Sequence, residues 1–124
     1  MADGHRSSED YLEAILVIRE KKGSCRSVDV AAHLGFSKPS VSVAVSKLVD
    51  SGCVERREDG QLLLTEKGLS IARSTLDKHL LLTDLFCSLG VSADTAEHDA
   101  CLIEHHLSEE TYEKLRLFWQ KHCG

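Results

Sequence analysis

The order of elements expected between residues 27 and 65 constrains the fold of this 124-residue chain more than any other feature. Residues 27–34, SVDVAAHL, have the apolar spacing of a short helix, and a turn containing Gly35 follows. A second helix is predicted over residues 38–51, because Ser37 can cap its start and Pro39 is tolerated in a first helical turn. A short helix, a glycine turn and a second helix together predict a helix-turn-helix.

Two strand-like runs follow this motif. They read CVERRE and QLLLT, and they flank Asp59-Gly60, a dipeptide that favours hairpin turns with positive φ. The pattern predicts a β-hairpin directly after the second helix. Such a hairpin would make the motif a winged helix-turn-helix.

The rest of the chain has helical periodicity. Helices are predicted over 7–22, 65–89, 92–106 and 108–121, whereas aromatic residues are only 5% of the chain and proline occurs once. We therefore expect a mainly α protein, with an N-terminal winged helix-turn-helix over 1–68 and an all-helical domain over 69–124.

The charge balance limits how such a chain can bind nucleic acid. The formal net charge is −5, so any contact with DNA must come from local basic or polar patches rather than from general positive charge. The second helix of the motif and the hairpin supply such groups, although they also suit ordinary caps and solvated charges on a module that binds protein. The candidates for DNA contact are Ser37, Lys38, Pro39, Ser40, Ser42, Lys47, Arg56 and Arg57.

Cysteine usage and hydropathy bear on location. The five cysteines include no C-x-x-C pair, so the sequence predicts neither a disulfide framework nor a zinc ribbon. The longest apolar run is far shorter than a membrane span of roughly 20 residues, and the N-terminus has no hydrophobic signal core. We expect a cytoplasmic protein without a membrane segment.

Potential metal ligands recur at helical spacing. Cys101, Glu104 and His105 stand at i, i+3 and i+4 of the helix predicted over 92–106, and therefore share one face. Asp10 and Glu13 have the same i, i+3 relation on the first predicted helix. Thiolate, carboxylate and imidazole together suit a divalent transition metal. Any one of these residues alone is more often a solvated or core side chain.

The whole chain resembles the diphtheria-toxin-repressor and manganese-transport-regulator family of metal-dependent repressors. The resemblance rests on SSEDYLEAI, VSVAVSKL, LTEKGL, KHLLLTDLF and HDACLIEHHLS. It implies a homodimer that binds palindromic operator DNA and represses metal-homeostasis genes when metal is bound. The ligands it implies are Asp10, Glu13, His79, Cys101, Glu104 and His105.

The choice of metal stays open between Fe²⁺ and Mn²⁺. In this family, iron-type members pair the cysteine with a methionine in the first helix, whereas manganese-type members pair an aspartate there with a glutamate in place of the cysteine. This chain combines Asp10 with Cys101. Co²⁺, Ni²⁺ and Zn²⁺ can substitute. The resemblance also allows two ions per chain, with Glu13 and His79 holding the second, since Thr83 and Glu97 depart from the ancillary site of iron-type members.

The resemblance further implies a mechanism. Metal held between the two domains would fix the spacing of two recognition helices in a dimer, so that metal and operator DNA favour each other's binding. The chain ends before the SH3-like third domain of many members, so we expect the short, two-domain form. Candidate dimer contacts are Leu85, Phe86, Leu89, Leu115 and Trp119.

Parts of the sequence also suit two other functions. A winged-helix redox sensor would oxidise Cys101, activated by His105, instead of binding metal there. An enzyme with Cys101 as nucleophile has little support, because the sequence has no glycine loop suited to an oxyanion site.

Overall fold

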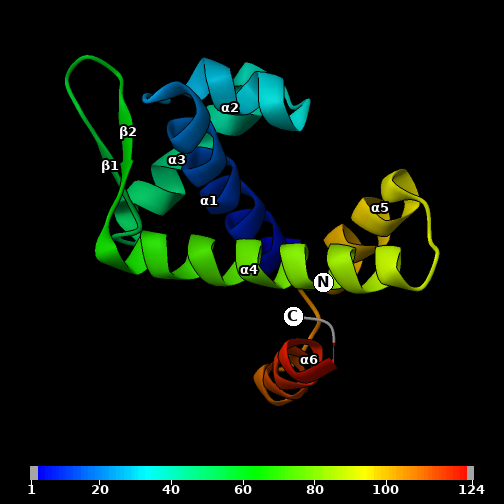
Figure 1. Cartoon of the computed structure of the whole chain (residues 1–124). Coiled ribbons are helices and arrows are strands. Elements are labelled where there is room, and N and C mark those ends of the chain that lie inside the picture. Colours follow the sequence, from blue (N-terminus) through cyan, green and yellow to red (C-terminus); the bar gives the residue numbers. More distant parts are fainter. Residues whose placement is uncertain (1–2, 123–124) are drawn as a thin grey trace. The chain divides into compact units, whose positions relative to one another are not determined.

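The structure, a computed structural model, describes residues 3–122, with side chains described from Ser8 onward (Figure 1). The chain divides into two compact units, with the boundary between Ser74 and Thr75. The elements are α1 (Asp3–Lys22), α2 (Ser27–Leu34), α3 (Lys38–Asp50), β1 (Val54–Arg56), β2 (Leu62–Leu64), α4 (Glu66–Ser88), α5 (Ala93–Ile103) and α6 (Glu109–His122). The mainly α fold with a winged helix-turn-helix is confirmed.

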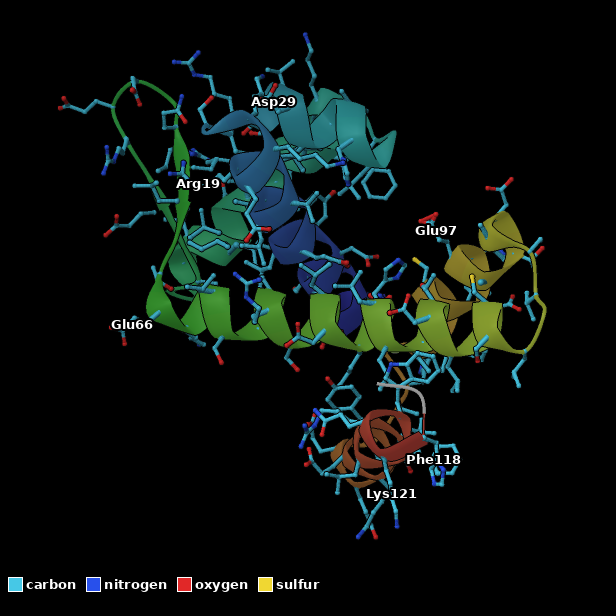
Figure 2. The ribbon with its side chains drawn as sticks, in the orientation of Figure 1. Arg19, Asp29, Glu66, Glu97, Phe118 and Lys121 are labelled. Atoms are coloured by element: carbon cyan, nitrogen blue, oxygen red, sulfur yellow. The ribbon has the colours of Figure 1, made fainter. Side chains whose placement is uncertain are left out.

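The first unit has a core formed by its three N-terminal helices. Ile15 of α1, Val30 of α2 and Val41 of α3 are completely buried, at the apolar positions that the periodicity marked. The hairpin joins this core through Leu62, whose N–H donates to the Cys25 carbonyl at 2.8 Å. Arg19 of α1 reaches the same strand and donates to the Leu62 carbonyl at 3.2 Å (Figure 2). The winged helix is thus one packed body.

The turn between α2 and α3 is confirmed in detail. Gly35 has a φ of 73°, a left-handed conformation that suits glycine, and its N–H donates to the Ala31 carbonyl at 2.9 Å. Ser37 caps α3, since its Oγ accepts a hydrogen bond from the Ser40 N–H at 3.3 Å. These two contacts stop α2 and start α3 within three residues.

The hairpin is shorter than the sequence predicted. The strands pair antiparallel, with Val54 opposite Leu64 and Arg56 opposite Leu62. Arg57 to Gln61 lie outside the strands, where the Gly60 N–H donates to the Arg57 carbonyl at 3.0 Å. This tight turn takes up residues that the patterns CVERRE and QLLLT assigned to strands, and Gly60 has the expected positive φ of 88°.

Two helix ends also differ from the prediction. The first helix begins at Asp3 rather than at residue 7, because its first turns carry no apolar residue that periodicity could detect. Helix α5 ends at Ile103 rather than at residue 106. The Glu104 N–H still donates to the Ala100 carbonyl at 2.9 Å. Ser108 then caps α6, because its Oγ accepts a hydrogen bond from the Thr111 N–H at 3.1 Å.

Helix α6 is attached to α4 by a charged contact within the second unit. Lys78 Nζ lies 2.6 Å from Glu109 Oε2, and the same ammonium lies 5.6 Å from the centre of the Tyr112 ring. Leu81 and Leu82 of α4 are buried, as are Ala96 and Ala100 of α5.

Two further expectations concern cysteines and membranes. The four cysteines that the structure describes are free thiols, whereas Cys123 lies outside the described residues. Among the described helices, none combines the length and the apolar composition that a membrane crossing requires.

Candidate DNA-reading surface and metal centre

Helix α3 presents a polar face opposite its buried one. Val41, Val45 and Leu48 are buried, and Pro39, Ser40, Ser42, Ser46 and Lys47 are exposed. The Ser40 hydroxyl accepts from the Ser37 hydroxyl at 2.9 Å, so part of this face also completes the helix cap. Hydroxyls and an ammonium beside a helix N-terminus suit both phosphate oxygens and base edges.

All eight residues predicted to contact DNA are exposed in the structure. Ser37 and Lys38 lie where α3 begins, and Arg56 lies on β1. Arg57 begins the hairpin loop instead of lying on a strand as predicted, and its N–H donates to the Gln61 carbonyl at 2.9 Å. The structure therefore leaves these groups accessible on α3 and on the hairpin.

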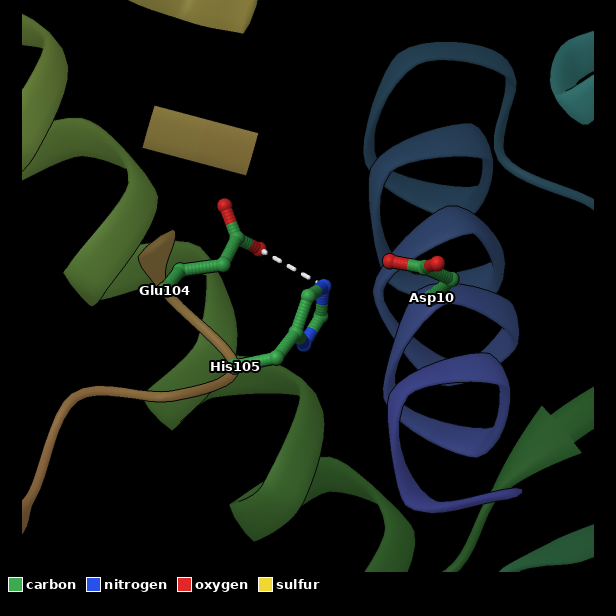
Figure 3. A group of neighbouring side chains, drawn as sticks. All are labelled: Asp10, Glu104 and His105. Atoms are coloured by element: carbon green, nitrogen blue, oxygen red, sulfur yellow. Dashed lines mark ion pairs between the residues drawn. The ribbon is translucent and has the colours of Figure 1, made fainter. Parts of the chain in front are cut away.

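The second unit brings three of the predicted metal ligands together. His79 Nδ1 lies 2.7 Å from Glu104 Oε1, and His105 Nε2 lies 3.7 Å from Glu104 Oε2. Figure 3 shows Glu104 and His105 as neighbours joined by this ion pair. His79 comes from the middle of α4, so helical spacing within one segment did not predict its contact with Glu104.

Glu104 is the most unusual side chain of this group. It is only 3% exposed, and within the described part of the chain its Oε2 atom accepts no hydrogen bond. Burial of a carboxylate oxygen that accepts no hydrogen bond is costly. A divalent cation would remove that cost, and a carboxylate beside imidazoles is a donor set that such an ion accepts. The residues present therefore fit a bound divalent metal.

Cys101 stands apart from these ligands. It is half-buried on the last turn of α5. Across the described residues, no set of three donor atoms within 4.8 Å of one another includes its sulfur. Helix α5 ends at Ile103, so Glu104 and His105 lie just beyond the helix that carries Cys101. His106 is exposed.

The remaining predicted ligands belong to the first unit. Asp10 and Glu13 are half-buried on α1, between core positions such as Leu12 and Ile15, and Figure 3 draws the Asp10 carboxylate on this helix. Their i, i+3 spacing places both carboxylates on one face of α1.

Comparisons with known proteins agree on one family. Residues 5–62 match the family described as "Iron dependent repressor, N-terminal DNA binding domain", and residues 65–122 match its "metal binding and dimerisation domain". The transcriptional regulator MntR of Escherichia coli O6:H1 is 37% identical over 122 residues, which are 97% of this chain and 79% of MntR. An uncharacterized HTH-type transcriptional regulator of Methanocaldococcus jannaschii is 36% identical, with 94% of each chain covered.

Solved structures of regulators share the fold. The manganese regulator SloR is 32% identical with a TM-score of 0.79, and the metal-dependent transcriptional regulator MtsR is 26% identical with a TM-score of 0.82. In each case the match covers 91% of this chain and 53% of the solved one, so the chain spans about half the length of those regulators.

These relatives decide between the functions weighed from the sequence. The matched family models describe domains for DNA binding, metal binding and dimerisation, MntR is named as a transcriptional regulator, and none of these matches supports a thiol redox sensor. The chain therefore belongs to the iron-dependent repressor family of metal-responsive, DNA-binding transcriptional regulators, which are not enzymes.

Proposed function

We propose that this regulator is a cytoplasmic homodimer that binds a palindromic operator when Mn²⁺ is bound, and so represses genes of metal homeostasis. The observation that carries the proposal is the buried Glu104 carboxylate, which has His79 and His105 as neighbours and one oxygen that accepts no hydrogen bond in the described chain. The named relatives MntR and SloR support a metal-dependent regulator of this kind.

Six side chains are proposed as ligands. In the second unit His79, Glu104 and His105 would bind the ion, and Asp10 and Glu13 would add carboxylates from α1. A bound metal would compensate the charge of these carboxylates, and its ligands would come both from the DNA-binding domain expected over 1–68 and from the metal-binding and dimerisation domain expected over 69–124. Cys101 is the sixth proposed ligand. Among the described residues, its sulfur belongs to no group of three donor atoms within 4.8 Å of one another, so we expect it to contribute less to metal affinity than the other five.

The donor set favours manganese over iron. Carboxylate oxygens and imidazole nitrogens predominate, and hard oxygen donors suit Mn²⁺. The manganese regulator SloR is 32% identical to this chain. Fe²⁺ remains the competing ion, because a thiolate such as that of Cys101 shifts the preference toward softer metals.

The DNA complex would use α3 as the recognition helix. In a dimer, two copies would enter successive major grooves about 34 Å apart, and Lys47, Arg56 and Arg57 would contact phosphates. A metal that selects the conformers with this spacing strengthens operator binding, and the operator strengthens metal binding by the same factor.

The test is a mobility-shift assay of the purified chain on duplexes selected from a random pool. Binding is measured in chelator and with added Mn²⁺, Fe²⁺, Co²⁺ or Zn²⁺, with Fe²⁺ kept anaerobic. We expect tight binding with Mn²⁺ and little in chelator, whereas equal binding in both would refute the metal switch.

Two cysteine variants then test the assignment of Cys101. Cys101→Ala should weaken Mn²⁺ activation modestly and remove more of the response to Zn²⁺, while Cys87→Ala, at an exposed cysteine of α4, should change neither. If Cys101→Ala keeps the metal stoichiometry and metal preference of the parent, Cys101 is not a ligand.

A further inference from the structure

Val43 is the most exposed large apolar side chain of the helix-turn-helix, with 58% of its surface open. It lies near the middle of α3, two residues from Val41 and two from Val45, which are both completely buried. A step of two residues turns a helix by about 200°, so Val43 projects from the side opposite the core. Packing within the unit therefore does not explain this valine.

The neighbours of Val43 on the helix surface are polar. Ser42 precedes it, and Ser46 and Lys47 follow one turn later; all three are exposed. Valine is also a poorer helix former than alanine or lysine, because its branched Cβ loses rotamer freedom. An apolar residue that lowers helix propensity at the centre of a polar face suggests a contact made outside the chain.

We propose that Val43 selects a thymine in the operator, by packing against the 5-methyl group that only thymine presents in the major groove. This inference rests on the proposed role of α3 as the recognition helix. Thymine presents this methyl group beside its O4 acceptor, whereas adenine, guanine and cytosine present hydrogen-bonding atoms and no methyl group against which an isopropyl group could pack. Ser42 and Ser46 hydroxyls can bond with several bases, so Val43 supplies discrimination that the serines lack.

The experiment replaces operator thymines one at a time by deoxyuridine, which lacks only the methyl group. The full-length chain with Mn²⁺ is titrated against each duplex, for the parent protein and for Val43→Ala. We expect one thymine per half-site at which deoxyuridine weakens parent binding about fourfold, the effect of one buried methyl group. Val43→Ala should bind the thymine duplex with a similar loss and show no further loss with deoxyuridine.

A matched control is available in the same domain. Val28 of α2 is exposed to a similar degree, 51%, but lies outside α3. Val28→Ala should therefore keep the affinity of the parent and its full sensitivity to deoxyuridine. Reselection of operators with Val43→Asn should replace the thymine by adenine, because an asparagine amide pairs with the adenine edge.

Two outcomes would overturn the inference, and they are distinguishable. If Lys47→Ala weakens binding but Val43→Ala retains the parent's discrimination between thymine and deoxyuridine, α3 reads DNA and Val43 does not select thymine. If neither substitution affects binding, α3 is not the recognition helix, and the wider proposal fails with this one.

Discussion

His79 Nδ1 lies 2.7 Å from Glu104 Oε1, a contact that joins the middle of α4 to the end of α5 across 25 residues of sequence. It fixes one oxygen of a buried carboxylate and leaves the other without a hydrogen bond in the described chain. The charge of Glu104 should therefore favour metal binding but lower the stability of the metal-free protein.

We predict that Glu104→Gln weakens Mn²⁺ binding by more than about 100-fold, because even outer-shell partners of a metal are worth about 10- to 100-fold in affinity. The amide keeps the shape of the side chain but removes its charge. In chelator the variant should melt at a higher temperature than the parent, since the substitution removes the charge of a buried carboxylate whose Oε2 accepts no hydrogen bond in the described chain. Isothermal titration calorimetry and thermal melts measure the two effects.

The control for this substitution is Glu97→Gln. Glu97 is an exposed acid on α5 (Figure 2), and its change should alter neither quantity. Unchanged Mn²⁺ affinity in Glu104→Gln would remove Glu104 from the metal centre.

A second prediction concerns the close approach of α4 to the chain before β1. A Cβ added at Gly68 would lie 2.0 Å from the backbone oxygen of Cys53. Thr65 holds the same region, because its hydroxyl donates to the Gly52 carbonyl at 2.6 Å. Gly68→Ala should therefore destabilise the protein by about 3 kcal/mol, although alanine normally favours a helix over glycine by about 1 kcal/mol.

Urea or thermal unfolding measures this cost. Ser70→Ala, at an exposed position two residues along α4, should change stability by less than about 0.5 kcal/mol. A Gly68→Ala protein as stable as the parent would show that the helix can move away from Cys53 without loss.

The sequence predicted the winged helix well because its signals are local. Gly35 and Ser37 fix the turn, and the apolar period of α3 identifies the face that carries Lys47. The predicted end of α5 at residue 106 was wrong, because no glycine or proline follows Ile103 to mark where the helix stops. The contact of Glu104 with His79 depends on packing between helices, which periodicity within one segment does not encode.

A third prediction follows from the first turn of α2. Asp29 accepts hydrogen bonds from Lys22 Nζ at 2.7 Å and from the Arg26 N–H at 2.9 Å, and the contact with Lys22, followed by that with Arg26, lowers the pKa of its carboxyl group. A lowered folded-state pKa means that the charged form stabilises the fold above the unfolded pKa of about 4. That stability is lost as the pH falls through the folded value.

Asp29→Asn should therefore cost roughly 0.5–1 kcal/mol at pH 7, after allowance for solvent screening of this surface pair. The difference from the parent should shrink below pH 4, where the parent's carboxyl group becomes protonated. Urea unfolding between pH 2.5 and 7 measures this, with Glu58→Gln in the exposed hairpin loop as the control. A cost independent of pH would assign the effect to shape rather than to charge.

The last prediction concerns thiol reactivity. Cys25 is completely buried, and burial, followed by the charge of Asp29, raises the pKa of its thiol to about 11. Cys87 is exposed. At pH 8 the thiolate fraction of Cys25 is about 200-fold lower than that of a cysteine with the ordinary pKa of about 8.5. We expect iodoacetamide to modify Cys87 readily in the folded protein and to leave Cys25 unmodified.

Peptide mapping by mass spectrometry after short pulses of reagent measures the two rates. In 8 M urea both cysteines should react at similar rates, because unfolding removes the burial that protects Cys25. Rapid modification of Cys25 in the folded protein would mean that the hairpin opens often enough to expose the thiol, since the Leu62 N–H of the hairpin donates to the Cys25 carbonyl.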